Sequence, residues 1–167
     1  MRLRHLLAAI VFIAAVAGGI FVMAPLKLSI AQSTDYSPPR TQESDDGWLI
    51  YVDAADIGPE LAADLNPSPA SPEEVVVKFL ASRMRGDSLW QETLVADRSS
   101  RLQRKIAKWQ KWTVAGFQLR GRKAARGDGV YVKVFFRVSI DGDNDEGTDE
   151  FQVVPEADGW RIADIPS

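Results

Sequence analysis

Residues 130–140, with the sequence VYVKVFFRVSI, constrain the fold of this chain more than any other segment. Their even-numbered positions are all apolar and mostly β-branched, whereas the odd-numbered positions are mostly polar or amphipathic. A period of two predicts a long β-strand that is covered on one face only. The apolar residues that can cover this face lie upstream, between Pro72 and Trp112. The pattern therefore predicts a small α+β domain.

The upstream segment carries start and stop signals for helices. Residues 71–74 combine an N-cap serine, a proline at the first helical position and two acids. An apolar stripe at helical spacing follows, and we expect this helix to end at Gly86. Asp87 or Ser88 can cap a short second helix, and a third helix is expected over residues 99–112.

Beyond residue 112 the period changes to two, which predicts four strands. They are expected over residues 114–122 (with Ala115, Phe117 and Leu119 on one face), 130–140, 148–154 and 160–165. Helices that precede a strand meander indicate an α+β fold, with the helices packed on a curved four-stranded antiparallel sheet.

Residues 1–31 predict a membrane anchor or a signal peptide. Arg2 and Arg4 precede an uncharged apolar run over residues 6–26. About 20 such residues can span a bilayer with the basic end in the cytoplasm. Small-x-small sites at residues 15–17 and 29–31 leave a cleaved signal as the alternative. We expect an exported domain, anchored in the inner membrane and facing the periplasm or the outside, or secreted if the segment is cleaved.

Residues 32–70 are acidic and rich in proline, which predicts an extended tether before a domain over residues 71–167. The apolar residues 48–52 interrupt this composition. They are interpreted either as an edge strand packed on the main domain or as a motif that adds a strand to a partner's sheet.

Composition narrows the chemistry that the domain can perform. The chain has no cysteine, which excludes disulfides, a thiol nucleophile and a cysteine-bound zinc ion. Its one histidine, His5, lies in the N-terminal segment, so the domain lacks the usual proton shuttle. We expect no catalytic residue, no metal site and no cofactor.

The order of elements, together with the motifs at residues 71–74, Phe79-Leu80, Gly86-Asp87 and residues 158–165, resembles the nuclear transport factor 2-like superfamily. The likeness is to its small exported bacterial members and covers residues 71–167. It implies a cone-shaped α+β domain. Enzymes of the superfamily, such as ketosteroid isomerase-like and polyketide cyclase-like proteins, use a carboxylate or histidine base in a pocket between helices and sheet. This chain departs from that pattern, so an isomerase or cyclase is kept only as an alternative.

Two residue sets are candidate binding sites. The first is aromatic and lines either a pocket for a small apolar molecule or an ordinary core: Phe79, Trp90, Trp109, Phe136 and Trp160. The second forms a cationic stripe at helical spacing, which is either a solvated face or a contact for anionic lipid or an acidic partner: Arg101, Arg104, Lys105, Lys108 and Lys111. Nucleic acid is not expected, because no stacking platform is interleaved with the stripe.

The acidic residues 141–147 are expected to form a solvated hairpin loop. The alternative interpretation of these residues is a calcium-binding loop. However, Glu146 occupies the position where an EF-hand needs glycine, and the flanking segments are predicted strands.

These observations predict a non-catalytic, exported, membrane-tethered domain that serves protein interaction or assembly in the cell envelope. The partner is an envelope protein or a second copy bound through the outer sheet face, where Tyr131 and Phe135 lie. Binding of a small apolar ligand is the alternative function.

Overall fold

The structure, a computed structural model, describes residues 36–167. The predicted anchor or signal segment lies outside the described residues. Among residues 36–167, no helix combines the length and apolar character that crossing a membrane requires. The elements in chain order are β1 (Thr41–Glu43), β2 (Leu49–Tyr51), α2 (Pro59–Asp64), α3 (Pro72–Arg85), the 3-10 helix η1 (Leu89–Thr93), α4 (Ser100–Trp109), β3 (Trp112–Ala124), β4 (Val130–Ile140), β5 (Asp143–Glu156) and β6 (Gly159–Asp164).

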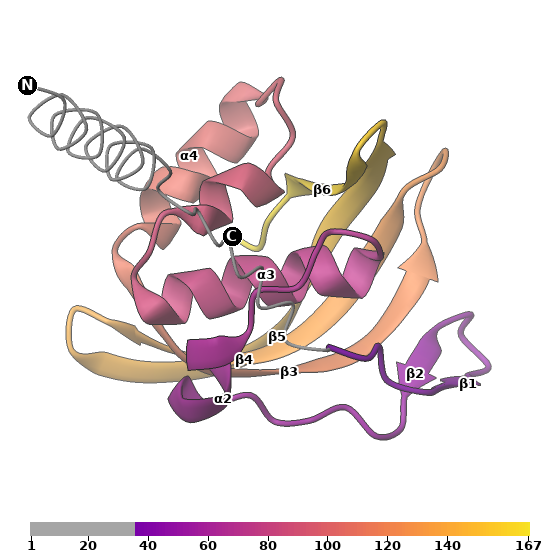
Figure 1. The fold of residues 1–167 in the computed structure, drawn as a ribbon, viewed down its shortest axis with the longest axis horizontal. Helices are drawn as coiled ribbons and strands as arrows, with labels where there is room; N and C mark the ends of the chain where they lie inside the picture. The colour runs from indigo at the N-terminus through magenta and orange to yellow at the C-terminus, as the bar shows by residue number, and fades with distance from the viewer. Residues whose placement is uncertain (1–35) are drawn as a thin grey trace, which may run out of the picture. The chain divides into compact units, whose positions relative to one another are not determined.

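The strands form one antiparallel sheet in the order β1-β2-β3-β4-β5-β6 (Figure 1). The α+β class is confirmed, but the predicted number of four strands is wrong, because β1 and β2 extend the sheet beyond β3. Gly121 permits this extension: a Cβ atom there would lie 2.7 Å from the carbonyl oxygen of Leu49. A glycine in a strand often marks such a close approach of two backbones.

The segment predicted as a tether contains β1, β2 and α2, which belong to the same packed unit. Ile57 exchanges main-chain hydrogen bonds of 2.8 and 3.0 Å with Phe117 of β3, and Ala62 of α2 has no exposed surface. The apolar residues 48–52 contain strand β2, which is packed on the domain, although β1 and not β2 is the edge strand. The packed unit therefore begins before the predicted boundary at residue 71.

β4 covers the residues predicted for it and alternates as expected. Val132, Val134, Phe136 and Val138 are buried, and the residues between them are half-buried. The predicted acidic loop over residues 141–147 is wrong. Asp141 and Gly142 make the whole turn with φ values of +53° and +94°, and β5 begins at Asp143. Asp-Gly is a favoured pair for such a two-residue hairpin turn.

The predicted inward face of residues 114–122 is right for Phe117 and Leu119 and wrong for Ala115, which is exposed. A β-bulge between Val114 and Gly116 shifts the register with β4. The extra residue turns Val114 inward and Ala115 outward, since a bulge interrupts the alternation of side chains.

Helix α3 begins and ends at the predicted signals. The Ser71 hydroxyl accepts a hydrogen bond of 3.2 Å from the Glu74 amide, and Pro72 is the first helical residue. Gly86 closes the helix in the left-handed conformation, with φ of +72°. Asp87 accepts a hydrogen bond of 2.9 Å from the Leu89 amide, so the capping role expected of it is confirmed.

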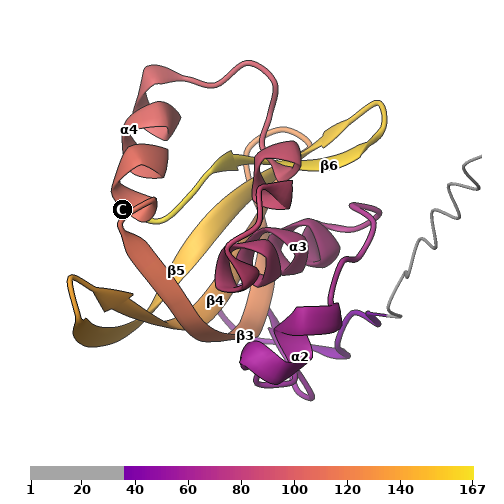
Figure 2. The same ribbon diagram turned by 60° about the vertical axis from the view of Figure 1, so that its left-hand side comes forward.

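Helices α3 and α4 lie on the same face of the sheet (Figures 1 and 2). Phe79 of α3, Trp109 of α4 and Phe151 of β5 contact one another, with ring centroids 5.7 to 5.9 Å apart. Arg83 of α3 donates hydrogen bonds of 2.7 and 3.0 Å to the carbonyl oxygens of Trp109 and Trp112. Arg83 therefore joins α3 to the end of α4. A cation beside the last carbonyl groups of a helix also stabilises that helix.

Candidate functional site

The predicted aromatic pocket is a filled core. Phe79, Trp90, Trp109 and Phe136 are at most 7% exposed. The space beside Phe79, Trp90 and Trp109 is too small for a water molecule. Trp160 lies apart from them in β6, where its amide donates a hydrogen bond of 2.8 Å to the Pro69 carbonyl. The structure therefore brings four of the five residues together and assigns them to packing.

A groove of about 700 Å³ opens outside this core, beside β3. One wall is the segment 36–40, the second is the segment 53–57, and the third is α2 with Leu65. Leu119 of β3 also lines it. Pockets for small molecules commonly measure about 300–1,000 Å³, so the groove is large enough to bind a ligand.

The groove forms because β2 separates from β3 soon after the two strands pair. Leu49 and Ile50 pair with β3, and main-chain pairing resumes at Ile57. Between them, the Gln118 side chain of β3 donates a hydrogen bond of 2.7 Å to the Ala54 carbonyl. The chain between them is joined to the segment that precedes β1 by two bonds from Arg40: its amide and its guanidinium donate hydrogen bonds of 2.7 and 2.6 Å to the Asp53 carboxylate. The clamp keeps two walls of the groove together.

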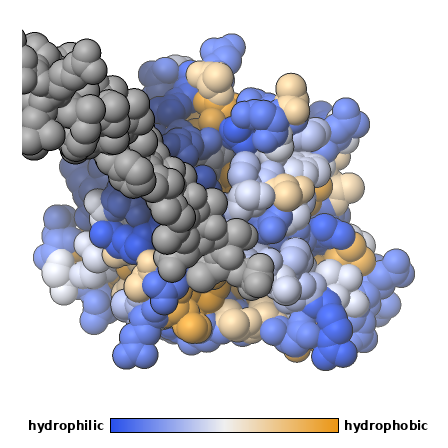
Figure 3. All heavy atoms as spheres, viewed as in Figure 1, coloured by the Kyte–Doolittle hydropathy of each residue, from blue (hydrophilic) through white to orange (hydrophobic). Residues whose placement is uncertain are grey.

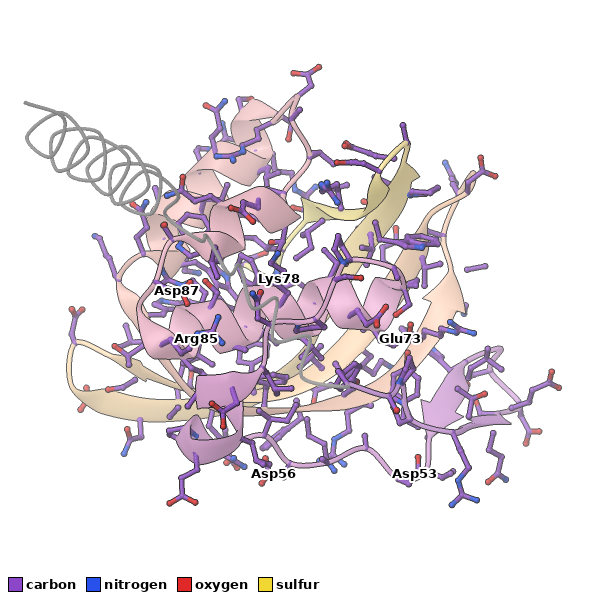
Figure 4. All side chains as sticks on the ribbon, in the orientation of Figure 1. Asp53, Asp56, Glu73, Lys78, Arg85 and Asp87 are labelled. Atoms are coloured by element: carbon purple, nitrogen blue, oxygen red, sulfur yellow. The ribbon has the colours of Figure 1, made fainter. Side chains whose placement is uncertain are left out.

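Arg85 holds α2 in place as the third wall. Its guanidinium donates hydrogen bonds of 2.7 and 2.6 Å to the carbonyl oxygens of Ala62 and Leu65 at the end of α2. The same side chain forms an ion pair of 2.7 Å with Asp87. Figure 4 shows Arg85 and Asp87 at the C-terminal end of α3 and Glu73 at its other end.

The groove is mostly apolar. The apolar residues that line it are Tyr36, Pro38, Pro39, Ala54, Ala55, Ile57, Leu61, Leu65 and Leu119. Leu61 is 55% exposed although it is a large apolar side chain. Figure 3 shows hydrophobic residues at the surface near α2, at the lower margin of the view. Such a surface is suited to bind apolar groups.

A buried carboxylate lies close to one end of the groove. Glu73 is 2% exposed, and its Oε1 accepts hydrogen bonds of 2.5 Å from the Tyr51 hydroxyl and 3.0 Å from Arg122. Its Oε2 is buried and has no hydrogen-bond partner among residues 36–167. Tyr36 lines the groove, and burial together with the nearby charges of Glu73 and Glu74 raises the pKa of its hydroxyl. At neutral pH this hydroxyl is protonated and can donate a hydrogen bond.

The acidic residues that suggested calcium binding do not converge. Asp143 and Asp145 lie along β5, where they share one face and Asn144 and Glu146 occupy the other. In the described part of the chain, no group of three or more His, Cys, Asp or Glu side chains could hold a metal ion.

The cationic stripe divides into two parts. Lys105 contacts Asp164 at 2.9 Å and donates a hydrogen bond of 2.6 Å to the Ile165 carbonyl, while Arg101 lies 3.3 Å from Asp164. These two side chains hold the C-terminal segment. Arg104, Lys108 and Lys111 are exposed, and Lys108 lies over the Trp112 ring at 5.3 Å.

The sequence analysis does not predict the groove, because apart from residues 48–52 the composition of residues 32–70 indicates an extended tether. One signal was present: Ile57, Leu61 and Leu65 recur at helical spacing, with Pro59 where a helix can begin. The local sequence indicates only that Glu73 is an acid of the first helical turn. No local pattern predicts that Tyr51 and Arg122 donate hydrogen bonds to it.

Comparisons with protein-family models, with curated proteins and with solved structures found no match.

Proposed function

We propose that this chain is a non-catalytic protein-interaction domain of the cell envelope, which binds an apolar segment of a partner protein in the groove. Export and membrane attachment are part of the proposal and are supported by the composition of residues 1–31. Membership of the nuclear transport factor 2-like superfamily is proposed on the motifs at residues 71–74, Gly86-Asp87 and 158–165.

The groove is the observation that carries the proposal. The aromatic interior leaves no room for a ligand, whereas the groove is open, apolar and about 700 Å³ in volume. An open groove lets a chain pass through it, and the exposed Leu61 offers an apolar contact at its rim. Apolar anchors in such grooves dominate the binding energy of peptide segments.

A photo-crosslinking amino acid placed at Ala54 or at Leu61 tests this function in cells. Both positions line the groove. Ala107 is the control, because it is exposed on α4, away from the groove. We expect the same partner protein to be crosslinked from positions 54 and 61 and not from position 107. Crosslinking from position 107 alone, or from none of the three, would contradict the proposal.

A small apolar molecule is a second candidate for the same groove. Its volume lies within the range of small-molecule sites, and most of its lining residues are apolar. The substitution Ala54→Trp fills the groove from one wall. A bound molecule would appear in native mass spectra as an adduct of fixed mass, absent from the Ala54→Trp variant, in a chain that carries no protein partner.

A further inference from the structure

Strand β5 has one open edge. β4 pairs with it from Asp143 to Val153, whereas β6 pairs only from Gln152 to Glu156. Residues 143–151 thus have a neighbouring strand on one side only, within the described chain (Figure 2). The residues from Asp143 to Glu150 are exposed apart from the partly buried Gly147.

β6 ends early because the chain after it is held by α4. Lys105 binds Asp164 and the Ile165 carbonyl, and the Trp109 indole donates a hydrogen bond of 3.0 Å to the Pro166 carbonyl. Pro166 has no amide proton and cannot continue a strand ladder. The edge of β5 is therefore left open by specific contacts elsewhere.

The main-chain groups of this edge are oriented to accept another strand. The amides of Glu146 and Glu150 donate hydrogen bonds to the carboxylates of Asp145 and Asp149, at 2.9 and 2.8 Å. Because main-chain groups alternate in direction along an antiparallel pair, the even-numbered residues 144–150 direct theirs toward the open edge. The two side-chain bonds protect the edge in the free protein.

The charges on this edge define the partner. On the outer face, Glu146 and Glu150 lie opposite Arg137 and Lys133 of β4. On the other face, three aspartates lie opposite apolar residues: Asp143 opposite Ile140, Asp145 opposite Val138 and Asp149 opposite Val134. No ion pair engages these three aspartates within residues 36–167. A second copy of this chain would bring acids against acids, which is destabilising.

We propose that residues 143–150 accept an extended segment of a partner protein as an added strand, with lysine or arginine at every second position facing the three aspartates. Main-chain hydrogen bonds of the added strand would provide affinity, and its alternating cations would provide specificity. This surface is distinct from the groove, and the proposal of strand addition does not depend on binding in the groove.

The test uses the full chain in a mild non-ionic detergent and a fluorescent nine-residue peptide with lysine at every second position and threonine or valine between. The matched control peptide carries N-methyl groups on the amides of one strand edge, which removes donors and keeps the charge. We expect anisotropy to report binding by the first peptide and at least tenfold weaker binding by the second. Hydrogen exchange of residues 143–151 should slow only with the first peptide.

Two protein variants complete the test. Asp145→Asn with Asp149→Asn removes two of the carboxylates, and we expect at least a tenfold loss of peptide affinity. Leu61→Glu alters the groove alone and should leave peptide affinity unchanged. The proposal is overturned if neither peptide binds, if both bind equally, or if exchange at residues 143–151 does not change.

Discussion

Glu73 is the acidic side chain on which the polar contacts at the start of α3 converge. It is buried, and the charge is compensated on one oxygen by Tyr51 and by Arg122, whose side chain is 38% exposed. A buried carboxylate without such donors would be strongly unfavourable. The cluster also connects three elements that are distant in sequence, β2, α3 and β3, next to the groove.

Replacement of Tyr51 by phenylalanine tests this cluster. The change removes one hydrogen bond to a buried carboxylate and keeps the ring, so we expect a loss of about 1.5–3 kcal/mol in the free energy of unfolding. Urea denaturation measures it. The control is Tyr131→Phe on the outer face, which should change stability by less than about 0.5 kcal/mol. Equal effects of the two substitutions would contradict the account.

The same tyrosines predict a loss of stability at alkaline pH. Burial, and then the hydrogen bond to Glu73 and its charge, raises the pKa of Tyr51; burial also raises that of Tyr36. Below pH 10 both hydroxyls are protonated in the folded and unfolded states, and above about pH 10 only the unfolded state releases these protons. Stability should therefore fall by up to about 1.4 kcal/mol per pH unit for each hydroxyl. Urea midpoints at pH 9–11.5 should fall less steeply in Tyr51→Phe.

At the scale of elements, α3 organises the domain through its ends. Arg83 and Arg85, in its last turn, cap the C-termini of α4 and α2. Gly86 then turns the chain with a positive φ. This closing turn positions Asp87 to bind Arg85 and to cap η1.

Gly86→Ala should cost about 1–2 kcal/mol, because an L-residue is strained in the left-handed region. No atom lies within 4 Å of a Cβ at this position, so a clash would not contribute. Gly147 is the matched control, since a Cβ there also meets open space and its φ is not positive. Thermal unfolding should show a lower Tm for Gly86→Ala only; equal shifts would contradict the assignment to backbone strain.

The elements that follow from local signals were predictable from sequence. β4 has strict alternation, and α3 has a cap at each end, so their bounds were expected closely. For β5 the strand predicted over residues 148–154 is confirmed, but its first residues, 143–147, were not predictable as strand, because acids are unusual in strands and their pairing with β4 depends on the tertiary fold. Bulges, such as the one at residues 114–116, likewise leave no clear mark in sequence.

At the scale of the whole domain, the interior is aromatic and closed. Phe79 contacts Trp90, Trp109 and Phe151 with ring centroids within 6.1 Å. Phe79→Ala should therefore lower the free energy of unfolding by about 3–5 kcal/mol, as in a packed core. The same substitution at a residue that lines a ligand cavity would lower the free energy of unfolding much less. Val52→Ala, at a position that is 53% exposed, is the control and should change stability by less than about 0.5 kcal/mol.

The groove and the buried Glu73 beside it were not predictable from local sequence. They arise where residues 36–65 meet β3, which lies more than forty residues further along the chain, as the main-chain bonds between Ile57 and Phe117 illustrate. Proline-rich composition predicted an extended tether, but the apolar residues Trp48, Tyr51 and Ile57 are buried against the sheet. Tertiary packing therefore determines the structure of this segment more than its local composition does.

The central claim is that this domain binds a protein partner in the groove and not a ligand in its interior. The first measurement is native mass spectrometry of the full chain, extracted from its own cells in mild detergent, with the Leu61→Glu variant measured alongside. We expect a complex with another protein that is lost in the variant. A chain that carries only a small adduct, or a chain whose protein complexes are all left intact by Leu61→Glu, would contradict it.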